Sequence, residues 1–244
     1  MTRSTSDEPP LGLVVSDWTP PAEPDGIALR GRYAELVRLD TNAHARALFA
    51  AYQGHDQVWD YLFDGPFHDL DGYRTWMDKS VSTKGQLFYA IKNRETDAWE
   101  GVASYLRIDP QSGSIEVGNI NYSPALQRTR AGTEAMFLMM QWAFNAGYRR
   151  YEWKCNGLNL PSRRAAQRLG FSFEGIFRQA VVVKGRNRDT AWFAAIDREW
   201  LALQNAYKVW LAPENFNEGQ QCQSLSALTA PIRVSSDPIL SGAK

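Results

Sequence analysis

The chain of 244 residues is predicted to be a mixed α+β protein in which helices flank one central sheet. Two observations lead to this fold class. Three strand-like runs follow one another at 86–93, 98–109 and 113–122, separated by the turn-rich segments RETD and PQSG, which favours an antiparallel meander. From residue 130 the apolar residues adopt a helical period, and helices and strands then alternate.

The amino-terminal third is expected to contain an arm, a strand and two helices. Residues 1–27 are rich in Pro, Ser and acidic residues, so we expect an irregular arm that lies across the domain through Trp18. A first strand is expected over 28–39. Asp40 or Thr41 can then cap a helix that runs to Tyr52, and a second helix is expected over 69–81, after an aromatic loop.

The carboxy-terminal half is expected to begin with the helix at 130–146, whose apolar residues share one face: Ala131, Ala135, Leu138, Met139, Trp142, Ala143 and Ala146. A strand follows at 149–155. Asn159 then starts a helix that stops at Gly170, and a long hairpin turns at KGRN. In the last helix, large apolar side chains share one flank and are expected to pack either on the core of the same chain or on a second subunit of a homodimer: Trp200, Leu203, Tyr207 and Trp210. The domain thus covers 28–211, and the polar residues 212–244 are predicted to be a flexible tail.

Composition excludes several classes of function. The 27 basic and 27 acidic residues cancel, so no global charge favours nucleic acid or an anionic membrane, and any anion site must be local. No run approaches the ~20 apolar residues of a spanning helix. The two cysteines are too few for a disulfide framework, and their spacing does not suit a metal site. We therefore expect a protein of the reducing cytoplasm.

The stretch SPALQRTRAGTEAMF places cationic residues at the start of the helix at 130–146. A helix amino terminus presents unpaired N–H groups and a partial positive charge, and this makes it a natural phosphate site. The arginines are alternatively only solvated. Gly118 in the preceding strand indicates a bulge, which would leave an edge able to receive a peptide-like ligand.

Together these segments resemble the acetyl-CoA-binding core of the GNAT N-acetyltransferases, in particular the RimJ/RimL type, over about residues 28–200. The loop pattern QxxGxG is matched by Gln127, Arg130 and Gly132, with Arg130 where the first glycine is expected. The pattern NxxNxxS with LGF is matched by Asn156, Asn159, Ser162, Leu169, Gly170 and Phe171. The later patterns EGxxR and KGR, with an aspartate after them, are matched by Glu174, Gly175, Arg178, Lys184, Gly185, Arg186 and Asp189.

The resemblance implies the GNAT fold, a mostly antiparallel sheet of about seven strands that is splayed at the cofactor cleft. It places pantetheine along Asn119, Ile120, Asn121 and Tyr122, and the diphosphate against Gln127, Arg128, Thr129, Arg130, Ala131, Gly132 and Thr133. Asn156, Asn159 and Arg163 are expected beside the cofactor, with helix capping as the alternative for Asn159. Either the Cβ of Arg130 crowds the diphosphate, or its side chain points outward and holds a phosphate.

The same resemblance suggests Glu116, on the strand that leads into the cofactor loop, as the general base. It suggests Ser162 as the general acid, because Ala166 occupies the position of the tyrosine that usually protonates the thiolate. The alternatives are a cross-strand pair between Glu116 and Arg107, and a Ser162 that bonds its own helix.

The aromatic loop is expected to supply an acceptor pocket through Trp59, Tyr61 and Phe63, although most of its aromatic residues suit a core. The function implied is acetyl transfer from acetyl-CoA to a primary amine, of a protein amino terminus or a small molecule, by direct attack in a ternary complex. The alternative is a non-catalytic acyl-CoA-binding regulatory module.

Overall fold

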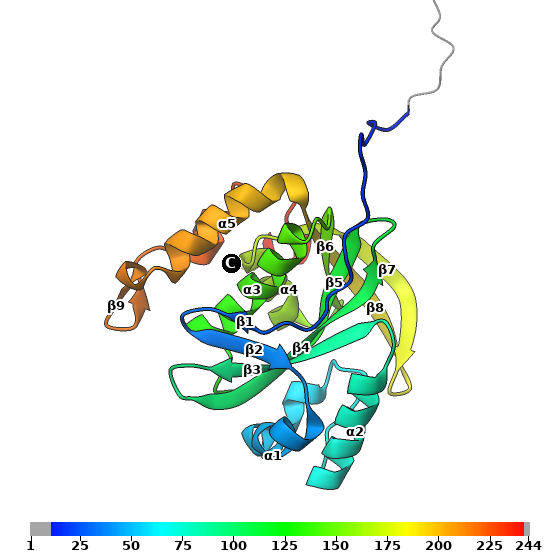
Figure 1. Ribbon diagram of the computed structural model, residues 1–244, viewed down its shortest axis with the longest axis vertical. Coiled ribbons are helices and arrows are strands. Elements are labelled where there is room, and N and C mark those ends of the chain that lie inside the picture. The colour runs from blue at the N-terminus through cyan, green and yellow to red at the C-terminus, as the bar shows by residue number, and fades with distance from the viewer. Residues whose placement is uncertain (1–10, 242–244) are drawn as a thin grey trace, which may run out of the picture.

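An eight-stranded sheet organises the computed structural model, which describes residues 11–241 (Figure 1). The strand order is β1-β2-β3-β4-β5-β6-β8-β7, and β5 and β6 are parallel whereas all other neighbours are antiparallel. The predicted fold class is therefore confirmed, with eight strands where about seven were expected. The strands are β1 (Leu29–Arg30), β2 (Ala34–Arg38), β3 (Gln86–Asn93), β4 (Ala98–Asp109), β5 (Ser114–Tyr122), β6 (Arg150–Asn156), β7 (Ser172–Val183) and β8 (Arg186–Ile196).

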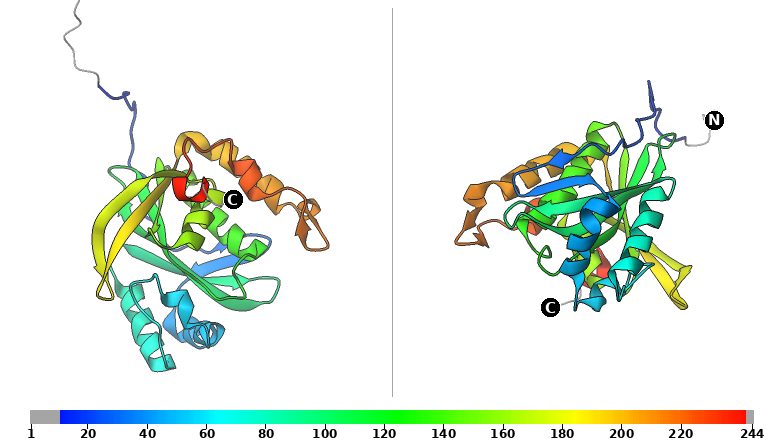
Figure 2. Two further views of the ribbon diagram at one scale, coloured as in Figure 1. Left: turned by 180° about the vertical axis from the view of Figure 1, so that it is seen from behind. Right: turned by 60° about the horizontal axis from the view of Figure 1, so that its bottom comes forward.

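Helices cover the two faces of the sheet unequally (Figures 1 and 2). The helices α1 (Thr41–Tyr52) and α2 (Leu70–Ser82) pack on β3 and β4, on what we call the α1/α2 face. The opposite face, called the α3 face, carries α3 (Arg130–Asn145), α4 (Leu160–Arg168) and α5 (Asp197–Leu211). On the α1/α2 face, the 3₁₀ helix η1 (Asp56–Trp59) contacts β5, and among the described residues no helix packs on β6 or β8.

Local sequence signals explain where these helices begin. Asp40, Asp69, Thr129 and Asn159 each accept a hydrogen bond from a backbone N–H in the first turn of α1, α2, α3 and α4, respectively. Such side chains satisfy amides that have no partner inside the helix. Asp40, rather than Thr41, is therefore the cap of the first helix.

The sheet opens between β5 and β6. Their ladder pairs Ser114–Val117 with Arg150–Trp153 and ends there, although both strands continue. Directly beyond, β5 has a bulge in which Asn119 and Ile120 face Ala103 of β4, and Asn119 takes a positive φ of 49°. A bulge bends a strand and increases its twist, so β5 diverges from β6 at this point. The predicted splay is present, one residue after Gly118.

The aromatic stripe of α5 packs on the core of its own chain. Leu203 and Tyr207 are fully buried, and the Tyr207 ring stacks on Phe137 at 4.9 Å between centroids. The Tyr207 hydroxyl donates to the Leu169 carbonyl at 2.9 Å. This resolves the two alternatives for the stripe, and it removes the sequence argument for a homodimer.

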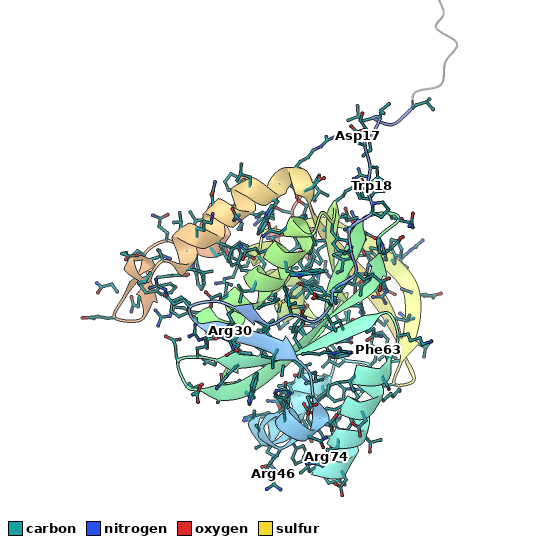
Figure 3. All side chains as sticks on the ribbon, viewed as in Figure 1. Asp17, Trp18, Arg30, Arg46, Phe63 and Arg74 are labelled. Carbon is teal, nitrogen blue, oxygen red and sulfur yellow. The ribbon has the colours of Figure 1, made fainter. Side chains whose placement is uncertain are left out.

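The arm before β1 has no helix or strand over residues 11–28, and residues 1–10 lie outside the described residues. Trp18 anchors the arm at the turn between β4 and β5, where its indole N–H donates to the Gln111 carbonyl at 3.1 Å (Figure 3). The Arg149 guanidinium lies over the Trp18 ring at 5.5 Å.

Residues 212–241 correct the prediction of a flexible tail, whose last residues 242–244 lie outside the described residues. The segment contains η2 (Pro213–Asn215), β9 (Phe216–Asn217), β10 (Gln220–Gln221), α6 (Leu225–Thr229) and α7 (Pro238–Ser241). Leu225 is fully buried in the main core, and Leu228 and Ile232 pack against it. Asp237 forms two hydrogen bonds of 2.6 Å with the Arg163 guanidinium in α4. A few buried contacts spread through a polar stretch therefore hold the segment in place.

No helix within residues 11–241 has both the length and the apolar composition needed to cross a bilayer.

Replacing Asp237 with Ala should lower the free energy of unfolding by about 3–5 kcal/mol, because it leaves the buried Arg163 guanidinium without its carboxylate. Urea denaturation followed by circular dichroism measures the change. Glu214→Ala, at an exposed position of the same segment, is the matched control and should change stability by less than about 0.5 kcal/mol. Equal small effects of both substitutions would show that the carboxy-terminal segment contributes little to folding.

Candidate active site

The opening between β5 and β6 leaves the facing backbone edges of two strands without a common ladder. The slot is bounded by residues 118–122 of β5 and 154–156 of β6. Backbone N–H and C=O groups are strong hydrogen-bonding groups, and an extended amide-containing ligand can pair with such an edge as an added strand would. The slot is therefore suited to a narrow chain with amide groups.

The amino terminus of α3 lies just beyond the end of β5 and forms an amide cradle. No hydrogen bond among the described residues uses the backbone N–H groups of Arg128, Arg130 or Ala131. The Thr129 hydroxyl accepts from the Gly132 N–H at 2.9 Å, and the Gln127 side chain donates to the Tyr122 carbonyl at 3.0 Å, which ties the loop to β5. Unpaired amides at a helix start bind phosphate groups.

Gly132 is needed for the close packing of this loop. A Cβ atom at this position would lie 2.7 Å from the Leu126 carbonyl oxygen and 3.0 Å from the Tyr122 ring. Because the first neighbour is backbone, it cannot rotate away, and the loop tolerates no side chain here.

The Arg130 side chain points away from the amide cradle. Its guanidinium lies over the rings of Tyr33 and Phe216, at 4.6 and 5.0 Å from their centroids, and it pairs with Glu95. The side chain is therefore turned away from the cradle with its guanidinium engaged elsewhere, and the phosphate contact and the crowding by its Cβ stay predictions. Arg130 instead connects the start of α3 to β9 and to the turn after β3.

The loop between β6 and α4 is shaped by two asparagines. The Asn156 side-chain oxygen accepts from the Leu158 N–H at 2.9 Å, and that of Asn159 accepts from the Ser162 N–H at 3.1 Å. Capping, the alternative for Asn159, is thus present. The amide nitrogens of both side chains make no hydrogen bond among the described residues, so both remain donors.

Arg163 does not point into the slot. Its guanidinium is buried and uses Asp237 and the Gly157 carbonyl, at 2.6 Å, as partners. The interpretation of Arg163 as a cofactor ligand is therefore replaced by a structural role.

A buried cluster of charges lies where the slot begins, on the α1/α2 face. The Glu116 carboxylate contacts Arg107 at 2.7 Å and Lys154 at 2.9 Å, and Lys154 also contacts Glu152 at 2.7 Å. Burial raises the pKa of Glu116, although both cations act in the opposite direction. A Cβ atom on Gly118 would be 3.4 Å from Glu116 Oε1, so the carboxylate extends along β5 toward the open edge. The alternative pair with Arg107 is present, and Lys154 is an additional partner.

Ser162 approaches the slot from the other face of the sheet. Its hydroxyl accepts from the Trp153 indole N–H at 3.0 Å, and it also hydrogen-bonds the Cys155 thiol. Burial raises the pKa of Cys155 to about 11, so this thiol is protonated at neutral pH. Trp153 and Cys155 belong to the α3 face, whereas Glu116 lies on the α1/α2 face. The two predicted catalytic side chains therefore flank the slot from opposite sides.

A cavity of about 220 Å³ lies beside the bulge of β5. Asn121 is 3% exposed, and neither polar atom of its side chain has a hydrogen-bond partner among the described residues. Buried polar groups are nearly always paired, so this side chain is available to a ligand. The lining residues are Trp59, Leu62, Phe63, Asp64, Trp76, Lys79, Ser80, Thr83, Gln86, Phe88, Asn119 and Asn121. We call this cavity the acceptor pocket.

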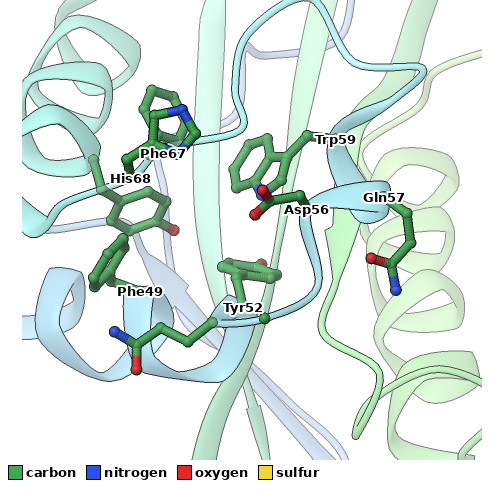
Figure 4. Close-up of a pocket in the computed structure, with 10 residues that line it drawn as sticks. Phe49, Tyr52, Asp56, Gln57, Trp59, Phe67 and His68 are labelled. Carbon is green, nitrogen blue, oxygen red and sulfur yellow. The ribbon is translucent and has the colours of Figure 1, made fainter.

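The loop at 56–68, which carries the predicted aromatic residues, closes one side of the acceptor pocket. Of the three aromatic residues predicted for an acceptor site, Trp59 and Phe63 line this cavity, whereas the Tyr61 hydroxyl donates to the Leu158 carbonyl at 3.4 Å. Lys184 Nζ donates to the Trp59 carbonyl at 2.8 Å, which fastens the loop to the β7–β8 hairpin. A larger cavity of about 530 Å³ lies on the other side of Trp59, between α1 and α2 (Figure 4).

Sequence reasoning missed Lys154, Trp76 and Arg188 near this site. The alternation in RRYEWKC places Lys154 on the same face as Glu152, and this was a usable signal. Trp76, in the lining of the acceptor pocket, and Arg188, on the Phe63 ring, come to this region only through the tertiary fold.

The comparisons with known proteins agree with this geometry. Residues 35–172 match the family model described as acetyltransferase (GNAT) domain. A GCN5-related N-acetyltransferase from Brucella melitensis is 45% identical, with a TM-score of 0.86 over 88% of this chain and 100% of that chain. A probable GNAT acetyltransferase from Chromobacterium violaceum is 40% identical, with a TM-score of 0.76 over 81% and 100%. The uncharacterized N-acetyltransferase p20 of Bacillus licheniformis is 28% identical over 61% of this chain and 85% of its own length.

Arg130→Ala tests the finding that this side chain stands apart from the amide cradle. The variant should lose about 0.5–2 kcal/mol of stability, since it removes a cation stacked between two rings, while its affinity for coenzyme A should stay within about twofold. Thermal unfolding and isothermal titration calorimetry measure the two effects. Gly132→Ala is the contrasting variant, because it disturbs the cradle backbone and should weaken coenzyme A binding on the order of tenfold. A large loss of affinity in Arg130→Ala would mean that its side chain does reach the cofactor.

Proposed function

Because the chain belongs to the GNAT acetyltransferase family, we propose that it transfers the acetyl group of acetyl-CoA to a primary amine bound in the acceptor pocket. The family gives acetyl-CoA-dependent acetyl transfer, and the amine acceptor is our proposal. The observation that carries it is the slot between β5 and β6, which has the amide cradle at one end and the acceptor pocket beside the other.

The residues present fit acetyl-CoA. The unpaired amides of Arg128, Arg130 and Ala131 would hold the diphosphate, and the edge formed by residues 119–122 would pair with the pantetheine amides. The free amide nitrogens of Asn156 and Asn159 add donors on the opposite side. When bound, acetyl-CoA supplies the thioester carbonyl and the thiolate leaving group.

Glu116 is the proposed proton acceptor for the amine. An ammonium group is not a nucleophile, so a base must take its proton before attack. Arg107 and Lys154 hold the carboxylate at the start of the slot, and burial raises its pKa toward the range that a base needs. Both cations act to lower the pKa of Glu116, so the balance between burial and these two ion pairs decides how strong a base the carboxylate is.

Ser162 is the proposed donor to the departing sulfur. Its oxygen already accepts a hydrogen bond from Trp153, so its own proton is directed to another acceptor. Its neighbour Cys155, whose pKa Ser162 acts to lower, supports the proposal that the hydroxyl can interact with a sulfur atom here.

We propose a RimJ/RimL-like acceptor range, consisting of protein amino termini and small-molecule amines, with direct attack in a ternary complex. The motif matches at Asn156, Asn159 and Ser162 support this subtype. The test is release of free thiol from acetyl-CoA with a panel of peptides, amino acids, polyamines and aminoglycosides. If coenzyme A raises the melting temperature but no amine is acetylated, the protein is a binding module rather than an enzyme.

Glu116→Gln should lower kcat/KM by about 10²–10⁴-fold at neutral pH, because the amine loses its proton acceptor. A base must be deprotonated, so wild-type activity should fall as the pH falls through the raised pKa of Glu116. The variant should lack that acidic limb and recover at high pH, where the amine deprotonates by itself. A pH profile of kcat/KM measures this.

Glu152→Gln is the matched control for Glu116→Gln. It also removes a carboxylate from Lys154, but one that pairs with Arg150 away from the open edge. Its activity should change by only a few-fold. Equal losses with unchanged pH profiles in both variants would exclude Glu116 as the base and assign the whole cluster a structural role.

A further inference from the structure

Arg188 of β8 is a buried cation without a carboxylate partner. The residue is 8% exposed, and its Nε atom is buried without a hydrogen-bond partner. No hydrogen bond or ion pair among residues 11–241 uses its guanidinium. Removing a charge from water is costly unless a partner of opposite sign compensates for it. The position of Arg188 therefore needs an explanation.

All other charged side chains of the described chain that are at least nine-tenths buried have polar partners. The carboxylate of Glu134 accepts from three backbone amides, and Arg163 binds Asp237. Glu100 accepts from Asn93 and Thr96, and Glu116 and Glu152 share Lys154. The fold thus satisfies its buried charges consistently, and Arg188 is the exception.

The contact of Arg188 with Phe63 does not compensate for its burial. The guanidinium lies 4.9 Å from the Phe63 ring centroid, but that ring is half-exposed. A cation–π contact at such a site contributes far less than the cost of burying an unpaired cation. Nearby Arg107 disfavours the charge further, and Glu116, which favours it, already has two cationic partners.

The location of Arg188 indicates what the missing partner is. Phe63, on which the guanidinium lies, is one of the residues that line the acceptor pocket, so Arg188 is a direct neighbour of the pocket lining on the β8 side. In that lining, Asn121 has both side-chain polar atoms without partners. A cation beside the pocket lining, an unpaired amide in that lining and several aromatic lining residues are complementary to a small molecule with an anionic group and an apolar part.

We propose that the acceptor amine carries a carboxylate, that Arg188 binds this carboxylate, and that Asn121 binds a neighbouring polar group. This rests on the function proposed above and narrows it to small amino-carboxylic acids. Arg188 presents a planar set of donors that matches the two oxygens of a carboxylate. The cavity of about 220 Å³ is smaller than the ~300–1,000 Å³ of sites for drug-sized ligands, which favours a compact acceptor over an aminoglycoside.

The test compares L-amino acids with their carboxamides as acceptors for the full-length protein. The pair differs in the carboxylate, and the amine of the amide is the more readily deprotonated, so chemistry alone favours the amide. We expect the wild type to prefer the acid by about 10–100-fold in kcat/KM. Arg188→Gln should abolish this preference, mainly by raising KM for the acid, and Arg188→Lys should restore part of it.

Arg186→Gln is the matched control, because Arg186 lies exposed at the turn of the same hairpin, and it should leave the preference unchanged. The inference is overturned if Arg188→Gln lowers the rates with acid and amide equally, or if it raises only the KM for acetyl-CoA. A peptide with a free amino terminus, an acidic first residue and an amidated carboxy terminus, if it is preferred to the free amino acids, would overturn the restriction to small molecules. If the wild type acetylates no amine, the proposed function fails, whereas acetylation without preference for a carboxylate rejects only the role of Arg188.

Discussion

The end of the β5–β6 ladder is the constraint on which the rest of the site depends. Two adjacent parallel strands normally pair along their length, because unpaired backbone groups in a sheet are costly. Here pairing stops after Val117 and Trp153, and the bulge at Asn119 turns β5 away. The consequence is a slot in the middle of the sheet, not at its edge. Glu116 and Ser162 therefore flank the slot from opposite faces of the sheet.

The amide cradle and the order of the elements around the slot depend largely on local sequence signals. The caps Asp40, Thr129 and Asn159 each accept from an amide three residues away, so such helix starts follow from short-range sequence, although Thr129 was not among the caps expected. The cradle lies at one such start. The helix periods and the turn residues between strands are equally local, which explains why the order of elements agrees with the sequence.

Contacts between distant segments were not predictable in the same way. Arg163 and Asp237 are 74 residues apart, and nothing near either residue in the sequence indicates the other. The Arg130 side chain likewise finds Phe216, which comes from a stretch with too few apolar residues to suggest a packed structure. Both arginines look like phosphate ligands when only their neighbours in the sequence are considered. Their guanidinium groups are instead used to hold the carboxy-terminal segment against the domain, and neither of the two is directed at the cradle.

The acceptor side is assembled entirely from such distant contacts. Its walls come from the loop at 56–68, from β5 and from α2, and the loop is held by Lys184 of the β7–β8 turn and by Leu158. The hairpin that positions the loop also carries Arg188. A change in the hairpin therefore alters both the shape of the pocket and the charge beside its lining, while the slot and the cradle keep their geometry. This separation allows one cofactor site to be combined with different acceptor specificities, and it places the determinants of the acceptor in the segments least constrained by local sequence rules.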